Sequence, residues 1–309
     1  MDKQDIQRVV TDRIIQAIEK GGMAAWIKPW ADIAAMDRGI PYNFLTGNEY
    51  RGINVLILAL GACENGFRHN AWLTYKQAQQ LGGQVRKGSR SQLCVFFKVE
   101  EKRQLNESTG EEDIKVFCPR IPFYLFNVDQ VDGLDLSAME KPAVTSADFR
   151  SSAISTLVNR QCEQTQLTFR HSGNHACYSP GLDLIRMPEG DFRTGDNYAA
   201  TLAHELIHAT GHVRRLDRHA KIDSMFPQDS RASYAFEELV AELGSAFLCA
   251  EHGIVGEHLQ HETYIDSWLH SLKRDKTLIF KAAKLASDAH HFVARIPEPS
   301  VTLPLAVAA

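Results

Sequence analysis

Several features that would place a protein in a familiar class are missing from this sequence of 309 residues. The longest nearly apolar run, residues 53–63, is too short to cross a bilayer as a helix. The six cysteines include no C-x-x-C pair, which excludes a zinc ribbon and is typical of reduced thiols in a cytoplasm. The first residues, Met-Asp-Lys-Gln-Asp, begin a helical pattern and do not resemble a secretory signal. We therefore expect a cytoplasmic protein with no membrane segment.

An excess of either charge is also missing, because 34 Lys and Arg stand against 38 Asp and Glu, for a net charge of −4. This balance excludes a globally basic nucleic-acid coat protein and a densely acidic mimic of DNA. The charge is nevertheless divided unevenly. Residues 1–130 carry 17 basic and 15 acidic side chains, a net of +2, whereas residues 131–309 carry 17 and 23, a net of −6. Residues 51–98 alone contain seven basic side chains and one acidic side chain, which indicates a basic module in the N-terminal half.

The strongest indication of chemistry is the motif His-Glu-Leu-Ile-His at residues 204–208. Histidines four residues apart lie on one face of an α-helix, so His204 and His208 can reach a single metal ion. The carboxylate of Glu205 lies beside that ion, where it can accept a proton from water. We interpret the histidines as ligands of Zn²⁺, which Mn²⁺ or Co²⁺ can replace by exchange, and Glu205 as the catalytic base. A buried helix whose histidines only satisfy hydrogen bonds is the less favoured alternative.

A hydrolytic zinc site needs a third protein ligand and leaves a fourth position for water. A third histidine at the end of His-Glu-x-x-His-x-x-Gly-x-x-His is excluded, because Arg214 occupies that position. Apolar residues at helical spacing predict a second helix between residues 230 and 253, which carries Glu238 and Glu242 on one face. Glu237 is a rival ligand one step around that helix, and an ordinary solvated acidic face is the other interpretation.

The pair of helices resembles the zincins of the thermolysin type. That resemblance implies that Glu238 is the third metal ligand. It also implies that Glu242 holds a zinc-bound histidine ring from behind and fixes its tautomer.

The basic module combines cationic and aromatic side chains. Cations can follow the phosphates of single-stranded DNA, while flat rings stack on the bases whatever their sequence. We therefore predict a largely sequence-independent interaction with single-stranded DNA through Trp72, Tyr75, Lys76, Arg86, Lys87 and Arg90. The alternative is that the two rings belong to a hydrophobic core and that residues 86–88 form a surface turn.

The patterning predicts an α+β fold with two separable domains. The boundaries are an N-terminal module of residues 1–135, a linker of residues 136–149, a C-terminal domain of residues 150–295 and a frayed tail of residues 296–309. In the first domain we expect a helix at about 2–20, an aromatic loop, helices at about 52–62 and 75–81, and a hairpin of strands 93–101 and 114–127. In the second we expect a helix at 147–161, strands at 166–170, 175–179 and 184–187, a site helix capped by Asp196 or Asn197, the second site helix, and a helical stretch over 257–293.

The order of the motifs resembles ArdC-type antirestriction proteins along nearly the whole chain. The matching segments are residues 50–54, 72–78, 85–88, 178–180, 185–188, 201–212, 215–216 and 237–242, together with Phe192 and Tyr198. In that family an N-terminal single-stranded DNA-binding domain, shared with TraC-type plasmid primases, precedes a zincin-like metallopeptidase domain. The resemblance implies a plasmid or mobile-element protein that binds single-stranded DNA entering a recipient cell and protects it from host restriction.

Two functions remain open at this point. In one, the chain is a DNA-associated peptidase whose protein target is a host restriction subunit. In the other, it is a DNA-binding protector whose metal is structural or regulatory, with His212 as a fourth ligand. The residue that stabilises an oxyanion is also open among His212, Arg214, Arg215 and Tyr234. The strand at residues 184–187 is expected to pair with an extended substrate.

Overall fold

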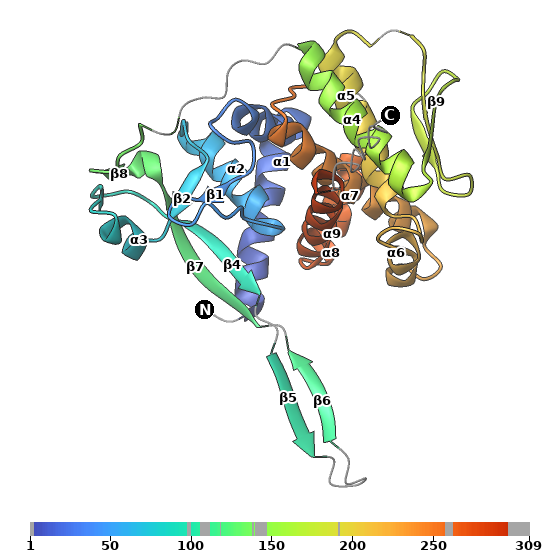
Figure 1. The fold of residues 1–309 in the computed structure, drawn as a ribbon. Helices are drawn as coiled ribbons and strands as arrows, with labels where there is room; N and C mark the ends of the chain where they lie inside the picture. Colours follow the sequence, from blue (N-terminus) through green and yellow to red (C-terminus); the bar gives the residue numbers. More distant parts are fainter. Residues whose placement is uncertain are drawn as a thin grey trace, which may run out of the picture.

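The computed structural model describes residues 3–97, 100–105, 112–117, 119–137, 139, 147–190, 192–256 and 262–295. The predicted α+β fold class is confirmed (Figure 1). The N-terminal elements are α1 (Lys3–Ala34), β1 (Tyr42–Asn43), α2 (Ile53–Asn65), β2 (Ala71–Leu73), α3 (Tyr75–Gln80), β3 (Gln84–Val85), β4 (Gln92–Phe97), β5 (Glu100–Leu105), β6 (Glu112–Phe117), β7 (Arg120–Asn127), a 3-10 turn (Val128–Gln130) and β8 (Val131–Asp132). The C-terminal elements are α4 (Ala147–Thr165), β9 (Thr168–His171), β10 (Cys177–Ser179), β11 (Leu184–Met187), α5 (Gly195–Thr210), α6 (His219–Met225), α7 (Ser230–Glu251), α8 (Glu262–Arg274) and α9 (Leu278–Ala294).

The N-terminal region is built on a sheet with the strand order β1-β2-β7-β4. Strand β7 is antiparallel to both β2 and β4, and one face of this sheet lies against α1 and α2 (Figure 1). Trp72, Cys94 and Leu125 on that face are fully buried. The hydrophobic effect of this contact fixes the strand register, because a slip of one residue would turn these side chains outwards.

Helix α1 is longer than the sequence predicts. The expected helix ends near residue 20 and an aromatic loop follows, whereas α1 continues to Ala34 with Pro29 inside it. Proline and the two glycines at positions 21 and 22 disfavour a helix locally. Trp30 and Ile33 are buried, however, and the ring of Trp30 lies 5.6 Å from that of Phe247 on α7. Tertiary burial therefore outweighs local propensity in this segment.

The predicted hairpin is present but contains four strands in place of two. Strands β4 and β7 pair next to the body, and β5 and β6 form a further antiparallel pair that projects away from it (Figure 1). The predicted turn at 106–110, most of the predicted linker and the predicted tail lie outside the described residues.

The C-terminal region places α5 and α7 side by side, next to a small sheet with the order β10-β11-β9. Gly244 allows the close crossing of the two helices. A Cβ atom at this position would lie 2.8 Å from Cγ2 of Ile207 on α5, closer than ordinary van der Waals contact. A glycine at the crossing therefore brings the acidic face of α7 within reach of the histidines on α5.

The two regions share one hydrophobic core, which argues against the expected separation into independent domains. A single cluster of buried side chains includes residues of α1, α2, β4 and β7 together with residues of α7, α8 and α9. At Gly39 the chain also approaches α7 so closely that a Cβ atom would overlap the carbonyl group of Ala250, with only 1.7 Å to its oxygen. The N-terminal and C-terminal regions thus fold around one common hydrophobic core.

The five described cysteines are all unpaired, and burial raises the pKa of the Cys94 thiol to about 12, which makes it unreactive. None of the helices in the described ranges is both long enough and apolar enough to cross a membrane.

We expect a fragment of residues 1–135 to aggregate or to melt without a cooperative transition, because it would expose the surfaces of α1 and α2 that α7, α8 and α9 cover. Size-exclusion chromatography and thermal melting followed by circular dichroism test this, with the full chain as the control. A monomeric fragment with a cooperative transition close to that of the full chain would contradict it.

Candidate functional site

The candidate site begins with the helix that carries the histidines. Helix α5 is capped by Thr194, whose hydroxyl accepts a hydrogen bond of 3.1 Å from the backbone N–H of Asn197. The cap therefore precedes the predicted Asp196 and Asn197, which lie inside the first turn. Both carry side chains that a cap uses, but the backbone becomes helical one residue earlier. From this start, His204 and His208 come to lie on the face that meets α7.

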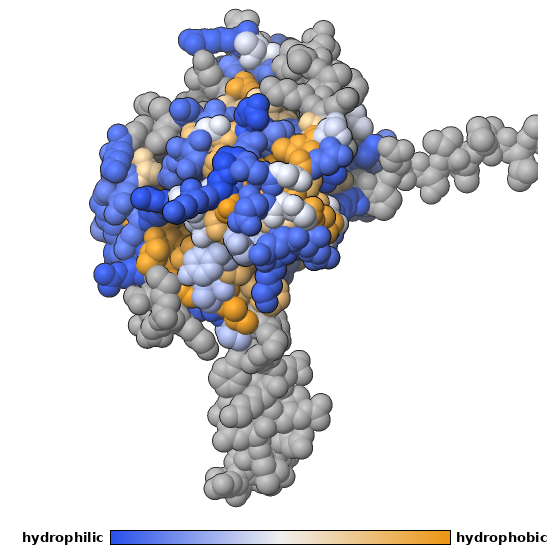
Figure 2. All heavy atoms as spheres, turned by 90° about the vertical axis from the view of Figure 1, so that its left-hand side faces the viewer, coloured by the Kyte–Doolittle hydropathy of each residue, from blue (hydrophilic) through white to orange (hydrophobic). Residues whose placement is uncertain are grey.

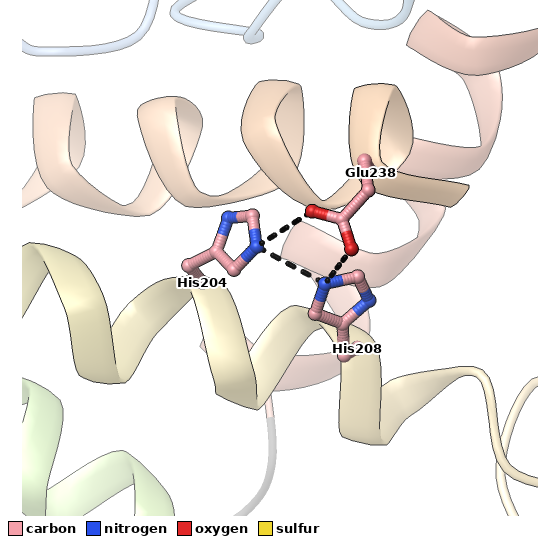
Figure 3. A group of neighbouring side chains, drawn as sticks. All are labelled: His204, His208 and Glu238. Atoms are coloured by element: carbon pink, nitrogen blue, oxygen red, sulfur yellow. Dashed lines mark hydrogen bonds and ion pairs between the residues drawn. The ribbon is translucent and has the colours of Figure 1, made fainter. Parts of the chain in front are cut away.

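The two histidines and Glu238 converge on one point (Figure 3). Nε2 of His204 lies 3.3 Å from Oε2 of Glu238, and Nε2 of His208 lies 3.5 Å from Oε1. The two Nε2 atoms are 3.0 Å apart, and all potential ligand atoms lie within 4.8 Å of one another. Two imidazoles and a carboxylate are the donor set of a hydrolytic zinc site and also suit Mn²⁺. The residues present therefore fit a divalent metal ion, with Glu238 in the place of the third ligand.

Each histidine ring is backed by a second carboxylate. Oε2 of Glu242 lies 3.7 Å from Nδ1 of His204, as the zincin resemblance implies. Oε1 of Glu237 lies 3.1 Å from Nδ1 of His208, a contact that the sequence did not suggest. A carboxylate behind Nδ1 holds the proton there and leaves Nε2 free for a metal. Glu237, the rival ligand, thus takes the same part for His208 as Glu242 does for His204.

Arg218 is a structural part of the site that the sequence analysis missed. Its side chain is 1% exposed and donates to both carboxylate oxygens of Glu237, over 2.9 and 2.6 Å. It also donates over 2.9 Å to the carbonyl of Ile207 and to the hydroxyl of Thr210, so it ties the end of α5 to α7. Burial raises the pKa of Glu237, but the charge and hydrogen bonds of Arg218 outweigh this effect and hold that pKa well below its usual value.

The carboxylates around the two histidines favour the protonated form of each ring. Burial by itself lowers the pKa of His204, but hydrogen bonding to Glu238 and Glu242 outweighs it and raises that pKa to about 10. Contacts with Glu237 and Glu238 raise the pKa of His208 to about 9 against the same effect of burial. A metal ion must displace these protons when it binds.

A cleft of about 450 Å³ opens onto the cluster, and Glu205 lies in its wall. Glu205 is 7% exposed and does not belong to the group of potential ligands, which in the described part of the chain consists of His204, His208 and Glu238. A carboxylate next to the ligands but outside their group is placed as a proton acceptor and donor requires.

Of the four oxyanion candidates, Tyr234 is the one that lines the cleft. Arg215 is fully buried elsewhere, where it donates to Asp183 over 3.1 Å and to the hydroxyl of Tyr178 over 3.2 Å. His212 also faces Asp183, with Nδ1 at 3.6 Å from Oδ2, so its predicted place as a fourth metal ligand is wrong. Arg215 and His212 therefore belong to a group of charged side chains around Asp183, away from the cleft. His219, which the sequence analysis did not consider, lines the cleft beside Tyr234.

The expected pairing of residues 184–187 with a substrate is also wrong. Strand β11, at Leu184–Met187, is the central strand of its sheet, with β9 and β10 hydrogen-bonded to its two sides. Strands β9 and β10 are the edge strands, and Cys177 and Tyr178 of β10 line the cleft. The free backbone groups beside the metal ligands therefore belong to β10.

The predicted DNA-binding residues divide into two groups. Trp72 is 0% exposed, and its ring packs at 5.8 Å from that of Phe67, so its assignment as a ring that stacks on bases is wrong. The alternation of β2 turns this side chain towards α1 and α2. The remaining predicted side chains are all exposed, namely Tyr75, Lys76, Arg86, Lys87 and Arg90. Of these, Arg86 is held by an ion pair of 3.0 Å to Asp132.

Each of the two regions matches a known protein family. Residues 4–125 match the family model of the N-terminal domain of anti-restriction factor ArdC, and residues 157–285 match that of a zincin-like metallopeptidase. The fold is similar to the metal-free crystal structure of antirestriction ArdC protein from the R388 plasmid, with a TM-score of 0.75 and 40% sequence identity over 94% of this chain and 97% of that one. The chain belongs to the ArdC antirestriction family. The resemblance expected from the sequence is thereby confirmed.

Other members and relatives of the ArdC family extend the comparison. The Mn(II)-bound structure of the R388 protein has a TM-score of 0.72 over the same shares of both chains. An uncharacterized protein y4eC of Sinorhizobium fredii is 36% identical over 91% of this chain and 89% of its own length. Two DNA primases TraC of Escherichia coli are 37% and 33% identical over 94% and 97% of this chain. The ArdC-type chain spans only 27% and 20% of those primases.

We expect His204→Ala and Glu238→Ala to lose stoichiometric metal, because each removes one of three ligand atoms. Glu205→Ala should keep it, and Glu237→Ala should bind it about 10- to 100-fold more weakly, since it removes only the support behind His208. Metal titration and elemental analysis of folded variants measure this. Normal metal content in Glu238→Ala together with its loss in Glu237→Ala would reverse the assignment.

Trp72→Ala should lower the free energy of unfolding by about 3–5 kcal/mol, as truncation of a large buried aromatic side chain does. The exposed Phe96 on the same sheet provides the control, since Phe96→Ala should change stability by about 0.5 kcal/mol or less. Denaturant unfolding followed by circular dichroism compares the two. Equal stability of both variants would show that Trp72 does not belong to the core.

Proposed function

We propose that this chain protects single-stranded DNA from restriction in a recipient cell, and that the cleft between α5 and α7 is a metal-dependent peptidase site. The metal is Zn²⁺, with Mn²⁺ or Co²⁺ as exchangeable substitutes. The protein target is a host component close to the entering strand, and host restriction subunits are the first candidates. The second function left open by the sequence, a structural metal closed by four ligands, receives no support from the position of His212.

One observation carries the peptidase part of this proposal. The described residues offer His204, His208 and Glu238 as ligands, and Glu205 stands beside them in an open cleft. Structural zinc sites are closed by four protein ligands, whereas catalytic sites keep one position open. A structural site would also have no use for a free carboxylate at Glu205.

The bound metal would polarise a peptide carbonyl and acidify water in the cleft. The residues of the chain supply the remaining functions. Glu205 accepts a proton from the attacking water and returns one to the leaving amine. Tyr234, half exposed in the same cleft, is placed to donate a hydrogen bond to the oxygen that gains charge. The edge strand β10 can hold an extended peptide by main-chain hydrogen bonds along the cleft.

The DNA part of the proposal is supported by family membership and by charge. Nearly the whole chain is similar to a part of the TraC primases, which act on DNA as their name states. Residues 75–90 carry four basic side chains and no acidic one, and those side chains are exposed. Such a surface attracts the phosphates of a nucleic acid without regard to sequence.

Glu205→Gln should retain metal and single-stranded DNA binding but reduce cleavage about 10²- to 10⁴-fold, because it removes the group that moves protons. The test incubates metal-loaded protein with single-stranded DNA and purified host restriction subunits, and detects new peptide termini by mass spectrometry. Glu163→Gln, an exposed change on α4, is the matched control and should cleave as the unaltered protein does.

The same two variants distinguish the peptidase from a protector that does not cleave proteins. Each is introduced into a recipient with an active restriction system, and the survival of transferred plasmid is counted. If Glu205→Gln protects the plasmid as well as Glu163→Gln does, and no target is cut by either, the peptidase proposal is wrong and the metal is structural or regulatory.

A further inference from the structure

The sheet of the N-terminal region has a second face, which is open to solvent at β7, where Tyr124 is exposed, although Leu73 and Val95 on that face are buried. Because side chains alternate along a strand, Phe126 and Tyr124 of β7 lie on the face opposite to Leu125. The register places Leu93 of β4 directly beside Tyr124. The ring of Tyr75 on α3 lies 6.4 Å from that of Phe126. Three aromatic rings thus follow one another across this face, from α3 to the middle of β7.

The outer rings of this row are open to solvent. Tyr124 is 53% exposed and Tyr75 is 44% exposed, while Phe126 between them is half-buried. Tyr124 and Phe126 are two residues apart on one strand, which separates their Cα atoms by about 6.6 Å. Figure 2 shows the side of the molecule that carries α3 and β8, where apolar patches interrupt a mainly hydrophilic surface.

Basic side chains are concentrated in the segment that begins at Tyr75. The segment from Tyr75 to Arg90 contains four basic side chains and no acidic one. Gln130, just beyond the end of β7, donates over 3.0 Å to the carbonyl of Arg90 and so fixes the loop beside the sheet. Lys76, Lys87 and Arg90 form no ion pair with any side chain of the described ranges, so their charges are not neutralised by the protein.

We propose that the open part of this sheet face binds single-stranded DNA, with Tyr75, Phe126 and Tyr124 stacking on successive bases. Lys76, Lys87 and Arg90 bind the phosphates. This inference rests on the proposed single-stranded DNA binding and gives it a location that excludes Trp72. Flat rings can stack only on bases that are not paired, and uncompensated cations favour a polyanion over an apolar peptide.

The test measures the affinity of the full chain for a fluorescent oligothymidine by anisotropy at several salt concentrations. Tyr124→Ala should weaken binding about 5- to 140-fold, the equivalent of one base stack, and leave the slope of affinity against salt unchanged. Tyr124→Phe keeps the ring and should bind as the unaltered protein does. Phe96→Ala is the matched control, because Phe96 is 55% exposed on the same sheet but on the opposite face.

A second arm separates stacking from charge. The double change Lys87→Gln and Arg90→Gln should reduce the salt slope by about 0.7 for each phosphate that the protein no longer neutralises, whereas Tyr124→Ala should not. Tyr124→Ala should also reduce the preference for single-stranded over duplex DNA, because duplex binding does not use the ring.

The outcomes distinguish the inference from the function on which it rests. If the unaltered protein binds no single-stranded DNA, both are wrong. If it binds and Tyr124→Ala binds equally well, the DNA path lies elsewhere and only this inference is wrong. If Tyr124→Ala changes the oligomeric state in sedimentation while DNA binding stays the same, the face is an interface between copies of the chain, and the inference is overturned.

Discussion

Three buried carboxylates on helix α7 need compensating partners, and the packing of the C-terminal region around them supplies these partners. Glu237, Glu238 and Glu242 on α7 are each less than 10% exposed. A buried carboxylate is costly unless a cation or hydrogen-bond donor compensates it. Here Glu237 has Arg218 and His208, Glu238 lies between both histidines, and Glu242 faces His204. The need to compensate these charges explains why α5 must cross α7 where it does, and why a glycine stands at the crossing.

The same helix joins the two regions of the chain. One side of α7 carries the glutamates, and other residues of α7, among them Phe247, pack against α1 and Trp30. The close approach of Gly39 to Ala250 lies at the end of that contact. The scaffold of the metal cluster is therefore continuous with the interior beneath the N-terminal sheet. A substitution that weakens the packing of α1 would therefore disturb the metal ligands through helix α7, which contacts both.

The candidate metal site and the proposed DNA-binding face differ in whether their charged side chains are buried and paired or exposed and unpaired. In the cleft, acidic side chains are buried and paired, which suits a cation held at fixed distances. Next to the N-terminal sheet, Lys76, Lys87 and Arg90 are exposed and form no ion pair in the described ranges, which suits a flexible polyanion bound without regard to sequence. The uneven division of charge between the two halves of the sequence, +2 and −6, reflects this difference.

Local spacing was enough to predict those features that depend on one helix or strand at a time. The interval between His204 and His208, and that between Glu238 and Glu242, places each pair on one helical face wherever the helix lies. The α+β class and most of the elements follow from periodicity in the same way, and the order of the motifs indicated the family. The limits of α1 did not follow, because Trp30 and Ile33 hold that helix together through contacts with a segment some 200 residues later in the sequence.

Only the tertiary structure decided which side chains are buried and what they face. Glu237 and Glu238 are neighbours in sequence, and their separate roles arise from the positions of His208 and Arg218 on other segments. Trp72 and Tyr124 are both aromatic residues on strands of one sheet, yet one is enclosed and the other open, because α1 and α2 cover a single face. The sequence by itself determined the donor atoms and their helical spacing. Burial depends on distant contacts, so the third ligand, the buried arginine and the exposed rings were decided by the fold.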